Sequence, residues 1–315
     1  MGAALGLAAR GRGRTSPNPN VGCIIVQGDR VVGRGWTQPG GRPHAEAQAL
    51  AEAGEAARDA TVYTTLEPCA HGSARGPDCS GLLIAAGVAR VVVALGDPDP
   101  RTNGRGIARL QEAGIAVTTG PGQAEARRSM AGFLTRRAAG RPFVTLKLAL
   151  SLDGCIALAD GESRWITGPE ARAHGHLERA QHEAILVGRG TLLSDAPRLD
   201  VRLPGLEDRS PRRILLSLHP QSGWTSIPAP VNIMSLAGVD HLLVEGGAQT
   251  AASFLRADLV DRLLLYRAPL LIGGGKPALS DIGLAELADA HGRWRLHDTR
   301  MLGSDRLEVY ERARD

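Results

Sequence analysis

One histidine, two cysteines and a glutamate lie within thirty-six residues of this chain, in a spacing that suits a metal site. His44-Ala45-Glu46 comes first, Pro68-Cys69 follows, and Cys79 ends the group after nine intervening residues. One imidazole and two thiolates leave one position of a tetrahedral Zn²⁺ open, which is typical of catalytic rather than structural zinc. The fold must therefore bring three separate segments to one point.

Helix geometry restricts how this can happen. Residues two apart on a helix point about 200° away from each other, so His44 and Glu46 cannot both face a site beside a regular helix. They can share a site if the metal lies beyond the N-terminus of a helix that starts near His44, and Pro43 favours such a start. We expect Cys79 also to precede a helix, with Ser80 as its cap. Two helix N-termini aimed at one point would favour thiolates.

The first half alternates short β-rich runs with helical runs, which predicts helices packed on a mostly parallel sheet. We expect strands at 21–26, 31–35, 61–66, 90–95 and 115–118, and helices at 45–53, 81–86, 107–113 and about 123–137. The Ala-, Gly- and Pro-containing segment 138–142 predicts a domain boundary, with one domain over 1–141 and another over 142–315.

A second α/β region follows. A helix is expected from Pro169 to about Gln181, because Thr167 to Glu170 has capping-box spacing. Strands are expected at 143–149, 184–187, 213–218, 241–244, 263–266 and 307–310, and a loop over 222–230. Cys23 and Cys155 are expected to fill space in or beside strands.

Composition argues against several classes of protein. The net charge is +4, but 35 of the 37 basic residues are arginines, and no block of like charges forms a nucleic-acid patch. No run is long enough to span a membrane, and the first residues do not resemble a signal peptide. With four cysteines and no disulfide pattern, we expect a cytoplasmic protein that binds a small molecule and not a nucleic acid or a membrane.

Two alternatives for the metal site stay open. His71 could be a fourth ligand that closes a structural zinc site, or the cysteines could be buried without a metal. The order His-x-Glu, Pro-Cys, Cys nevertheless has the form of the zinc-deaminase signature, in which the glutamate transfers protons and is not a ligand. Glu46 is accordingly our candidate for the general acid and base.

Flanking motifs make the resemblance more specific. Segments 16–26, 65–72, 96–100 and 104–106 resemble the deaminase domain of riboflavin biosynthesis, and segments 147–154, 165–168, 187–191 and 244–247 continue the match into a second domain. The chain thus resembles the bacterial bifunctional deaminase-reductase family over nearly its whole length. The resemblance implies a cytidine-deaminase-like α/β/α domain followed by a dihydrofolate-reductase-like α/β domain. No G-x-G-x-x-G follows a strand, so a Rossmann domain is not expected.

The family implies two reactions and two cofactors. A zinc site of His44, Cys69 and Cys79, with Glu46 as proton shuttle, would deaminate 2,5-diamino-6-(ribosylamino)pyrimidinone 5′-phosphate. NADPH would then reduce the ribosyl group of the product to a ribityl group. The resemblance also implies a homo-oligomer, a dimer or a tetramer.

The resemblance assigns further residues to each site. Deaminase substrate contacts would be Asn20, His71, Arg75, Asp97 and Asp99. NADPH contacts would be Ala149, Trp165, Thr191, Asp195, Ser217, Gly246 and Gly247. Reductase substrate contacts would be Lys147, Ser163, Arg179, Leu199, Arg202 and Glu245.

The chain departs from the family pattern in both halves. Thr37 stands where histidine is frequent and Asp99 where asparagine is usual, and the interval from Cys69 to Cys79 is one residue longer than is common. Only 26 residues separate Ser217 from Val244, several dozen fewer than usual, so the reductase domain is shortened around 218–240. We expect deamination to be intact and reduction to be retained with a smaller cofactor site.

Three alternatives for function remain. The reductase domain could be impaired, which would leave a deaminase only. The chain could deaminate another nucleoside or a tRNA base, although this would leave the second domain unexplained. It could also be a scaffold that uses zinc only for folding, although such a site would not need Glu46.

Overall fold

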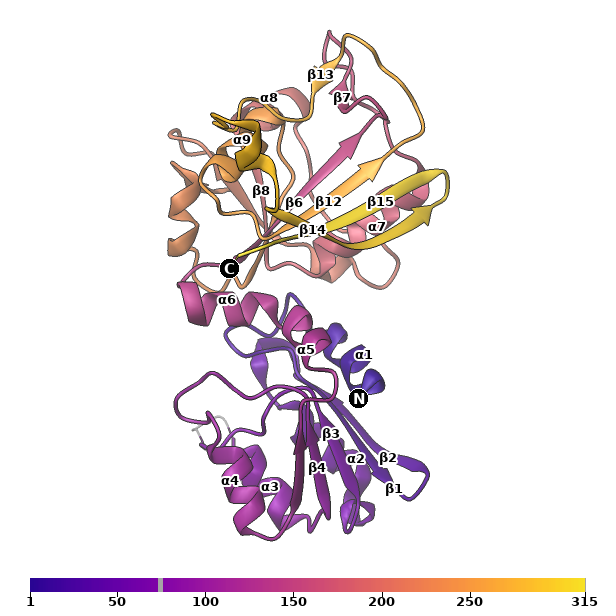
Figure 1. The fold of residues 1–315 in the computed structure, drawn as a ribbon, viewed down its shortest axis with the longest axis vertical. Helices are drawn as coiled ribbons and strands as arrows, with labels where there is room; N and C mark the ends of the chain where they lie inside the picture. Colours follow the sequence, from indigo (N-terminus) through magenta and orange to yellow (C-terminus); the bar gives the residue numbers. More distant parts are fainter. Residues whose placement is uncertain (73–75, 315) are drawn as a thin grey trace. The chain divides into compact units, whose positions relative to one another are not determined.

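The computed structural model describes residues 1–72 and 76–314, and they form two compact units, Met1–Gly140 and Arg141–Asp315. The boundary expected from the sequence lies one residue further along the chain. Each unit has its own largely aliphatic core. Figure 1 shows the elements of both units as a ribbon.

Unit 1 is built around a mixed sheet. In spatial order its strands are β2 (Arg30–Trp36), β1 (Gly22–Gln27), β3 (Thr61–Thr64), β4 (Arg90–Val93) and β5 (Ala116–Thr119). The β1 strand is antiparallel to both of its neighbours, and only β3, β4 and β5 run parallel. The expected mostly parallel sheet is therefore wrong for this unit, because two of its four strand pairings are antiparallel.

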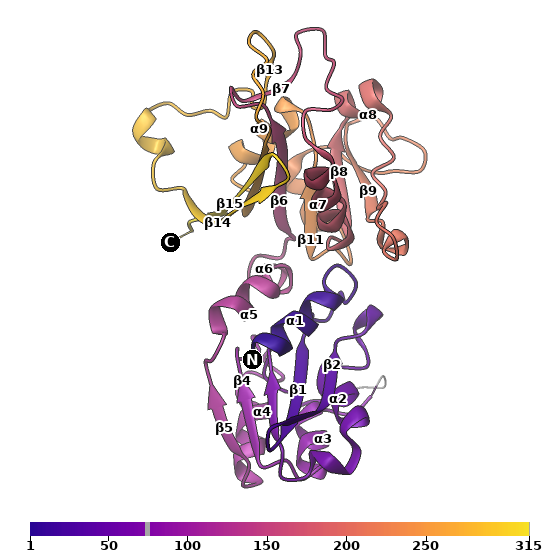
Figure 2. The ribbon, with the colours of Figure 1, turned by 90° about the vertical axis from the view of Figure 1, so that its right-hand side faces the viewer.

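Helices cover both faces of this sheet (Figure 2). A Cβ on Gly22 would lie 1.9 Å from the Ala4 carbonyl oxygen, and one on Gly35 would lie 2.0 Å from that of Ala45. Gly22 and Cys23 are consecutive in β1, so they face opposite sides of the sheet. Gly35 is paired with Cys23 and therefore lies on the face opposite to Gly22. Helix α1 (Gly2–Gly11), next to Gly22, and helix α2 (Ala45–Ala53), next to Gly35, thus pack on opposite faces. The other helices are α3 (Cys79–Ala85), α4 (Arg105–Glu112), α5 (Gln123–Ser129) and α6 (Ala131–Ala139).

Unit 2 contains a larger sheet with a parallel centre. Its strands in spatial order are β10 (Thr225–Ile227), β9 (Arg212–Leu216), β8 (Ala184–Gly188), β11 (His241–Val244), β6 (Phe143–Leu150), β12 (Arg262–Arg267), β15 (Asp305–Arg312) and β14 (Trp294–Leu302). The β12–β15 and β15–β14 pairings are antiparallel, and the other pairings described for this sheet are parallel. The helices are α7 (Pro169–Ala180), α8 (Arg189–Asp195) and α9 (Ala248–Arg256), and β7 (Cys155–Ala157) pairs with β13 (Lys276–Pro277).

Several local expectations need correction. The segment expected to be one helix over 123–137 is divided into α5 and α6 at Met130. The loop expected over 222–230 contains β10, and a 3-10 helix (Pro230–Ser235) follows it. Gly168, not Thr167, precedes the first turn of α7, so the capping box does not form there. Cys23 and Cys155 are buried in β1 and β7, as expected.

Candidate active sites

The three candidate metal ligands come together in unit 1. His44 is the N-cap residue of α2, Cys79 is the first residue of α3, and Cys69 lies in the loop after β3. One ligand atom of each lies within 4.8 Å of the others. Asp78, not Ser80, caps α3, because its carboxylate accepts the Gly81 N–H at 2.7 Å.

The donor atoms fit a zinc ion. His44 Nδ1 lies 3.3 Å from Cys79 Sγ and 3.6 Å from Cys69 Sγ. Tetrahedral zinc with ordinary bond lengths would separate nitrogen and sulfur ligands by about 3.6 Å. His71, the alternative fourth ligand, lies outside this group of donors, and its Nδ1 is 3.3 Å from Thr102 Oγ1. Within the described residues, the donor set therefore has three members.

The two cysteine thiols differ in pKa. The side-chain hydrogen bond from Cys79 lowers the pKa of Cys69 to about 4, and the Cys79 N–H also donates to Cys69 Sγ at 3.2 Å. The same pairing, together with burial, raises the pKa of Cys79. One thiolate is thus available near neutral pH, and a divalent cation would favour deprotonation of the other.

Glu46 lies in the first turn of α2, beside the donor group. Its side chain is buried and accepts a hydrogen bond from Thr64 Oγ1 at 3.3 Å. Burial raises the pKa of Glu46. A carboxylate with a raised pKa holds a proton more readily, which suits a general acid and base next to a metal site.

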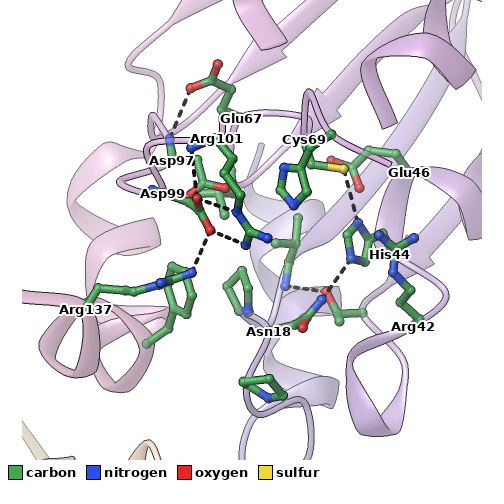
Figure 3. Close-up of a pocket in the computed structure, with 17 residues that line it drawn as sticks. Asn18, Arg42, His44, Glu46, Glu67, Cys69, Asp97, Asp99, Arg101 and Arg137 are labelled. Atoms are coloured by element: carbon green, nitrogen blue, oxygen red, sulfur yellow. Dashed lines mark hydrogen bonds and ion pairs between the residues drawn. The ribbon is translucent and has the colours of Figure 1, made fainter. Parts of the chain in front are cut away.

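His44, Glu46 and Cys69 line a cavity of about 250 Å³ (Figure 3). Three of the expected substrate contacts also line it, namely His71, Asp97 and Asp99. Arg75 lies outside the described residues. The cavity is further lined by residues that the sequence analysis did not select, among them Asn18, Arg42, Glu67, Arg101, Phe133 and Arg137.

Asn20, which was expected to contact the deaminase substrate, lies outside the cavity lining. It is buried, but its amide donates to the Ala8 carbonyl at 3.2 Å and to Ser129 Oγ at 3.1 Å, and it does not line the cavity. Asn18 lines the cavity instead, and its Nδ2 lies 2.9 Å from His44 Nε2. Both residues belong to the same Pro-Asn motif, so the sequence indicated the segment but not which asparagine faces inward.

Glu67 fixes the loop on the other side of the cavity. Its buried carboxylate accepts backbone N–H groups from Asp97 (3.2 Å), Gly104 (3.0 Å), Gly106 (3.0 Å) and Ile107 (3.2 Å). These bonds connect the start of α4 to the loop that carries Asp97 and Asp99. A glutamate directly before Pro68-Cys69 could have been noticed from the sequence, but its partners are distant in the chain.

Asp97 and Asp99 differ in charge state. Burial raises the pKa of Asp97 to about 6, whereas hydrogen bonds from Arg101 hold the pKa of Asp99 well below its usual range. Asp99 also contacts Arg137, with Nη2 and Oδ2 2.6 Å apart. The cavity thus holds a permanently ionised carboxylate beside one that titrates near pH 6.

The expected cofactor contacts of unit 2 gather at the carboxyl ends of its parallel strands. Ala149 is near the end of β6, Ser217 follows β9, and Gly246-Gly247 lies between β11 and α9. Ligands of open α/β sheets bind at this edge. A Cβ on Gly247 would lie 3.7 Å from Thr191 Oγ1, so Thr191 of α8 is next to this glycine pair.

The expected substrate contacts of unit 2 include an ion-pair cluster. Glu245 is nearly buried and pairs with Arg179 at 2.8 Å and with Lys147 at 3.7 Å. These two cations keep the pKa of Glu245 low, at about 2, despite its burial. Arg179 also donates to the Asp200 carbonyl at 3.1 Å, and the Arg202 Nε lies 3.6 Å from the Asp200 carboxylate.

The remaining expected contacts differ in how deeply they are buried. Trp165 is 65% exposed, with the Arg172 guanidinium 4.9 Å from the centre of its ring. Ser163 lies in the same loop, where Arg164 donates to the Asp195 carbonyl at 3.0 Å. Leu199 is buried in the core next to β8 and β9.

No helix among the described residues has the length and apolarity needed to cross a membrane.

Family models match both units: residues 1–95 match the cytidine and deoxycytidylate deaminase zinc-binding region, and residues 142–223 and 224–307 match the RibD C-terminal domain. The break after residue 223 falls in the shortened stretch. The fold and donor set thus define a zinc-binding deaminase domain of the cytidine deaminase class, linked to a RibD-type C-terminal domain.

Relatives match nearly the whole chain. Riboflavin biosynthesis protein RibD of Escherichia coli is 41% identical, over 97% of this chain and 96% of its own length. The Mycobacterium tuberculosis protein of the same name is 37% identical over 98% and 95%. The chain belongs to the RibD family of riboflavin biosynthesis proteins.

Solved structures agree with this assignment. Acinetobacter baumannii RibD superposes with a TM-score of 0.88 at 34% identity, over 100% of this chain and 98% of that one. A diaminohydroxyphosphoribosylaminopyrimidine deaminase/5-amino-6-(5-phosphoribosylamino)uracil reductase from Thermotoga maritima gives 0.86 at 29% identity, over 99% and 97%. The cytidine-deaminase-like and dihydrofolate-reductase-like folds expected from the sequence are confirmed.

Proposed function

We propose that this chain catalyses two successive steps of riboflavin biosynthesis. Unit 1 hydrolyses the 2-amino group of 2,5-diamino-6-(ribosylamino)pyrimidin-4-one 5′-phosphate, and unit 2 uses NADPH to reduce the ribosyl group of the product. The observation that carries the first step is the His44, Cys69 and Cys79 donor group, together with the cavity that His44, Cys69 and the Glu46 carboxylate line.

Zinc held by His44, Cys69 and Cys79 would supply Lewis acidity, which makes water nucleophilic near neutral pH. Glu46 takes the proton that this water loses as its oxygen bonds to C2 of the pyrimidine. Glu46 then gives a proton to the departing amino group, which leaves as ammonia. Its raised pKa suits both transfers.

Polar side chains of the cavity orient the pyrimidine in this proposal. Asn18 contacts both the His44 ring and the Gly41 carbonyl, so its amide is held beside the metal ligands. His71 and Asp97 provide further polar contacts to the pyrimidine, and we still expect Arg75 and Asp99 to contact the substrate. Asn18 takes the role that the sequence analysis gave to Asn20.

Unit 2 binds NADPH and the ribosyl group in this proposal. NADPH would supply the hydride. Ala149, Trp165, Thr191, Asp195, Ser217, Gly246 and Gly247 hold the cofactor. Lys147, Ser163, Arg179, Leu199, Arg202 and Glu245 contact the substrate, and the Glu245 ion pairs fix the cations Lys147 and Arg179 next to the cofactor loop.

A product assay tests both steps. The purified zinc-loaded protein is incubated with the diaminopyrimidine ribosyl phosphate, with and without NADPH, and the products are identified by mass. We expect the deaminated ribosyl compound without NADPH and the ribityl compound with it. A deaminated product in both cases would show an impaired reductase, the alternative that the shortened segment between β9 and β11 favours. No deamination would reject the proposal.

We also propose that the chain is a homo-oligomer in the cytoplasm. Edge strand β14 exposes Leu296 and Met301, and exposed apolar edges are usually covered by another surface. The four cysteines are all free, which suits a reducing compartment. Light scattering on the purified protein tests the oligomeric state, and a monomer at micromolar concentration would contradict it.

A further inference from the structure

Two arginines converge on one carboxylate in the unit 1 cavity. Arg101 contacts Asp99 through Nε (3.0 Å) and Nη2 (2.6 Å), and Arg137 contacts it through Nη2 (2.6 Å). Figure 3 shows this cluster across the cavity from His44 and Cys69. A ligand that reaches from the metal donors across the cavity would therefore meet guanidinium groups.

Two guanidinium groups share the Asp99 carboxylate. Asp99 is almost fully buried, and its single negative charge faces two guanidinium groups. The side chains of Arg101 and Arg137 remain 62% and 44% exposed, so both can donate to a ligand as well as to Asp99. Such planar donor groups bind phosphate with two hydrogen bonds at once.

Both guanidinium groups are held before a ligand arrives. Arg137 extends from α6, and its guanidinium lies 5.5 Å from the centre of the Phe133 ring, which also lines the cavity. Arg101 lies two residues from Asp99, in the loop that Glu67 ties to α4. Little conformational entropy would be lost on binding, which is the advantage of preorganised contacts.

We infer that Arg101 and Arg137 bind the 5′-phosphate of the deaminase substrate and that Asp99 positions them. This rests on the proposed function, which supplies a ribosyl-phosphate substrate. The aspartate also accounts for the departure from asparagine at this position, because a carboxylate can hold both cations. Arg137 gives unit 1 its own means of distinguishing a nucleotide from a nucleoside.

Kinetics with two substrates test the inference. Arg137→Ala and Arg101→Ala are compared with the unaltered protein on the ribosyl-phosphate substrate and on its dephosphorylated form. Loss of a charged hydrogen bond predicts a KM about 10- to 100-fold higher for the phosphorylated substrate, with kcat little changed. The kcat/KM for the dephosphorylated form should stay within about twofold.

Arg128→Ala is the matched control, because Arg128 is an exposed arginine of α5 that pairs with Glu125 and does not line the cavity. It should change neither KM. Equal losses on both substrates would show that the arginines only support the loop, and unchanged KM values would also overturn the inference.

Direct binding separates this inference from the proposed reaction. Ribose 5-phosphate is titrated into the full-length protein and into the Arg101→Ala/Arg137→Ala double variant, with heat as the readout. The double variant should bind one equivalent of ribose 5-phosphate per chain less than the unaltered protein does. This result is expected whether or not the protein deaminates its substrate. Equal stoichiometry and affinity would reject the phosphate site, whereas absent deamination alone would reject only the proposed function.

Discussion

Glu46 shares a site with His44 although the two residues are only two positions apart on the chain. His44 has extended backbone geometry at the N-cap of α2, and Glu46 lies in the first helical turn. The change of backbone conformation between them overcomes the divergence that a continuous helix would impose. The short motif works because the helix starts inside it.

Glu46→Gln should abolish deamination and retain the metal. The amide has nearly the same shape but cannot accept and release a proton, so turnover should fall by about 10²- to 10⁴-fold. Zinc per chain, measured by atomic emission, should be unchanged.

Glu52→Gln is the control on the same helix, since Glu52 is exposed and pairs with Arg34. Its turnover should equal that of the unaltered protein. Loss of zinc in Glu46→Gln, or full activity, would contradict the role of Glu46.

Asp97 should make the stability of unit 1 depend on pH. Burial raises its pKa in the native state to about 6, so ionisation favours the unfolded chain, where the pKa is near 3.8. The stabilisation is complete below pH 4 and is lost as the pH rises to about 6. Asp97→Asn should remove this dependence, which amounts to at most about 3 kcal/mol.

Thermal unfolding of both proteins at several pH values between 4 and 7 checks this prediction. The variant should gain stability relative to the unaltered protein as the pH increases. A difference that does not vary with pH would show that Asp97 has an ordinary pKa.

At the scale of elements, the position of α2 depends on the absence of a side chain at Gly35. A Cβ there would meet Ala45 and Ala49 backbone atoms at 2.0 and 2.7 Å. Gly35→Ala should therefore push α2 away from β2, lower the free energy of unfolding by about 1–3 kcal/mol, and weaken zinc binding by displacing His44.

Denaturant titration and zinc analysis measure both effects. Gly6→Ala in α1 is the control, because no atom lies within 4 Å of the added Cβ, and it should be neutral or slightly stabilising. Equal stability of the two variants would mean that α2 can move without cost.

Helices and strands could be predicted from the sequence where neighbouring residues form a clear pattern. The expected strand at 90–95 corresponds to β4, and the expected helix at 45–53 to α2, since each has a clear run of residues and a glycine stop. Strand β14 and helix α1 were not expected. Most β14 residues are exposed, so it lacks the apolar alternation that indicates a strand, and its pairing with β15 is set by distant residues.

At the scale of the whole molecule, the two candidate sites draw on different units with separate cores. The Glu46→Gln variant, which is altered only in unit 1, should therefore still use NADPH to reduce the deaminated ribosyl compound. Gly246→Ala should lose reduction, because its Cβ would lie 2.5 Å from Thr250 Cβ, and should keep deamination.

Mixing the two variants tests this independence. Because the intermediate can diffuse between molecules, the mixture should convert the diaminopyrimidine to the ribityl product, which neither variant forms alone. The rate of NADPH oxidation measures this. No product from the mixture would show that both sites must be intact in one chain.

The sequence by itself determined the metal donors, the order of two α/β domains and the family, because these depend on residue type and spacing. Only the tertiary structure decided which asparagine enters the cavity and that Asp78 caps α3. It also decided that Glu67, Arg101 and Arg137 meet the loop of Asp97 and Asp99. The contacts of Glu67 and Arg137 join segments far apart in the chain. Their geometry depends on how helices and strands pack, which local patterns do not encode.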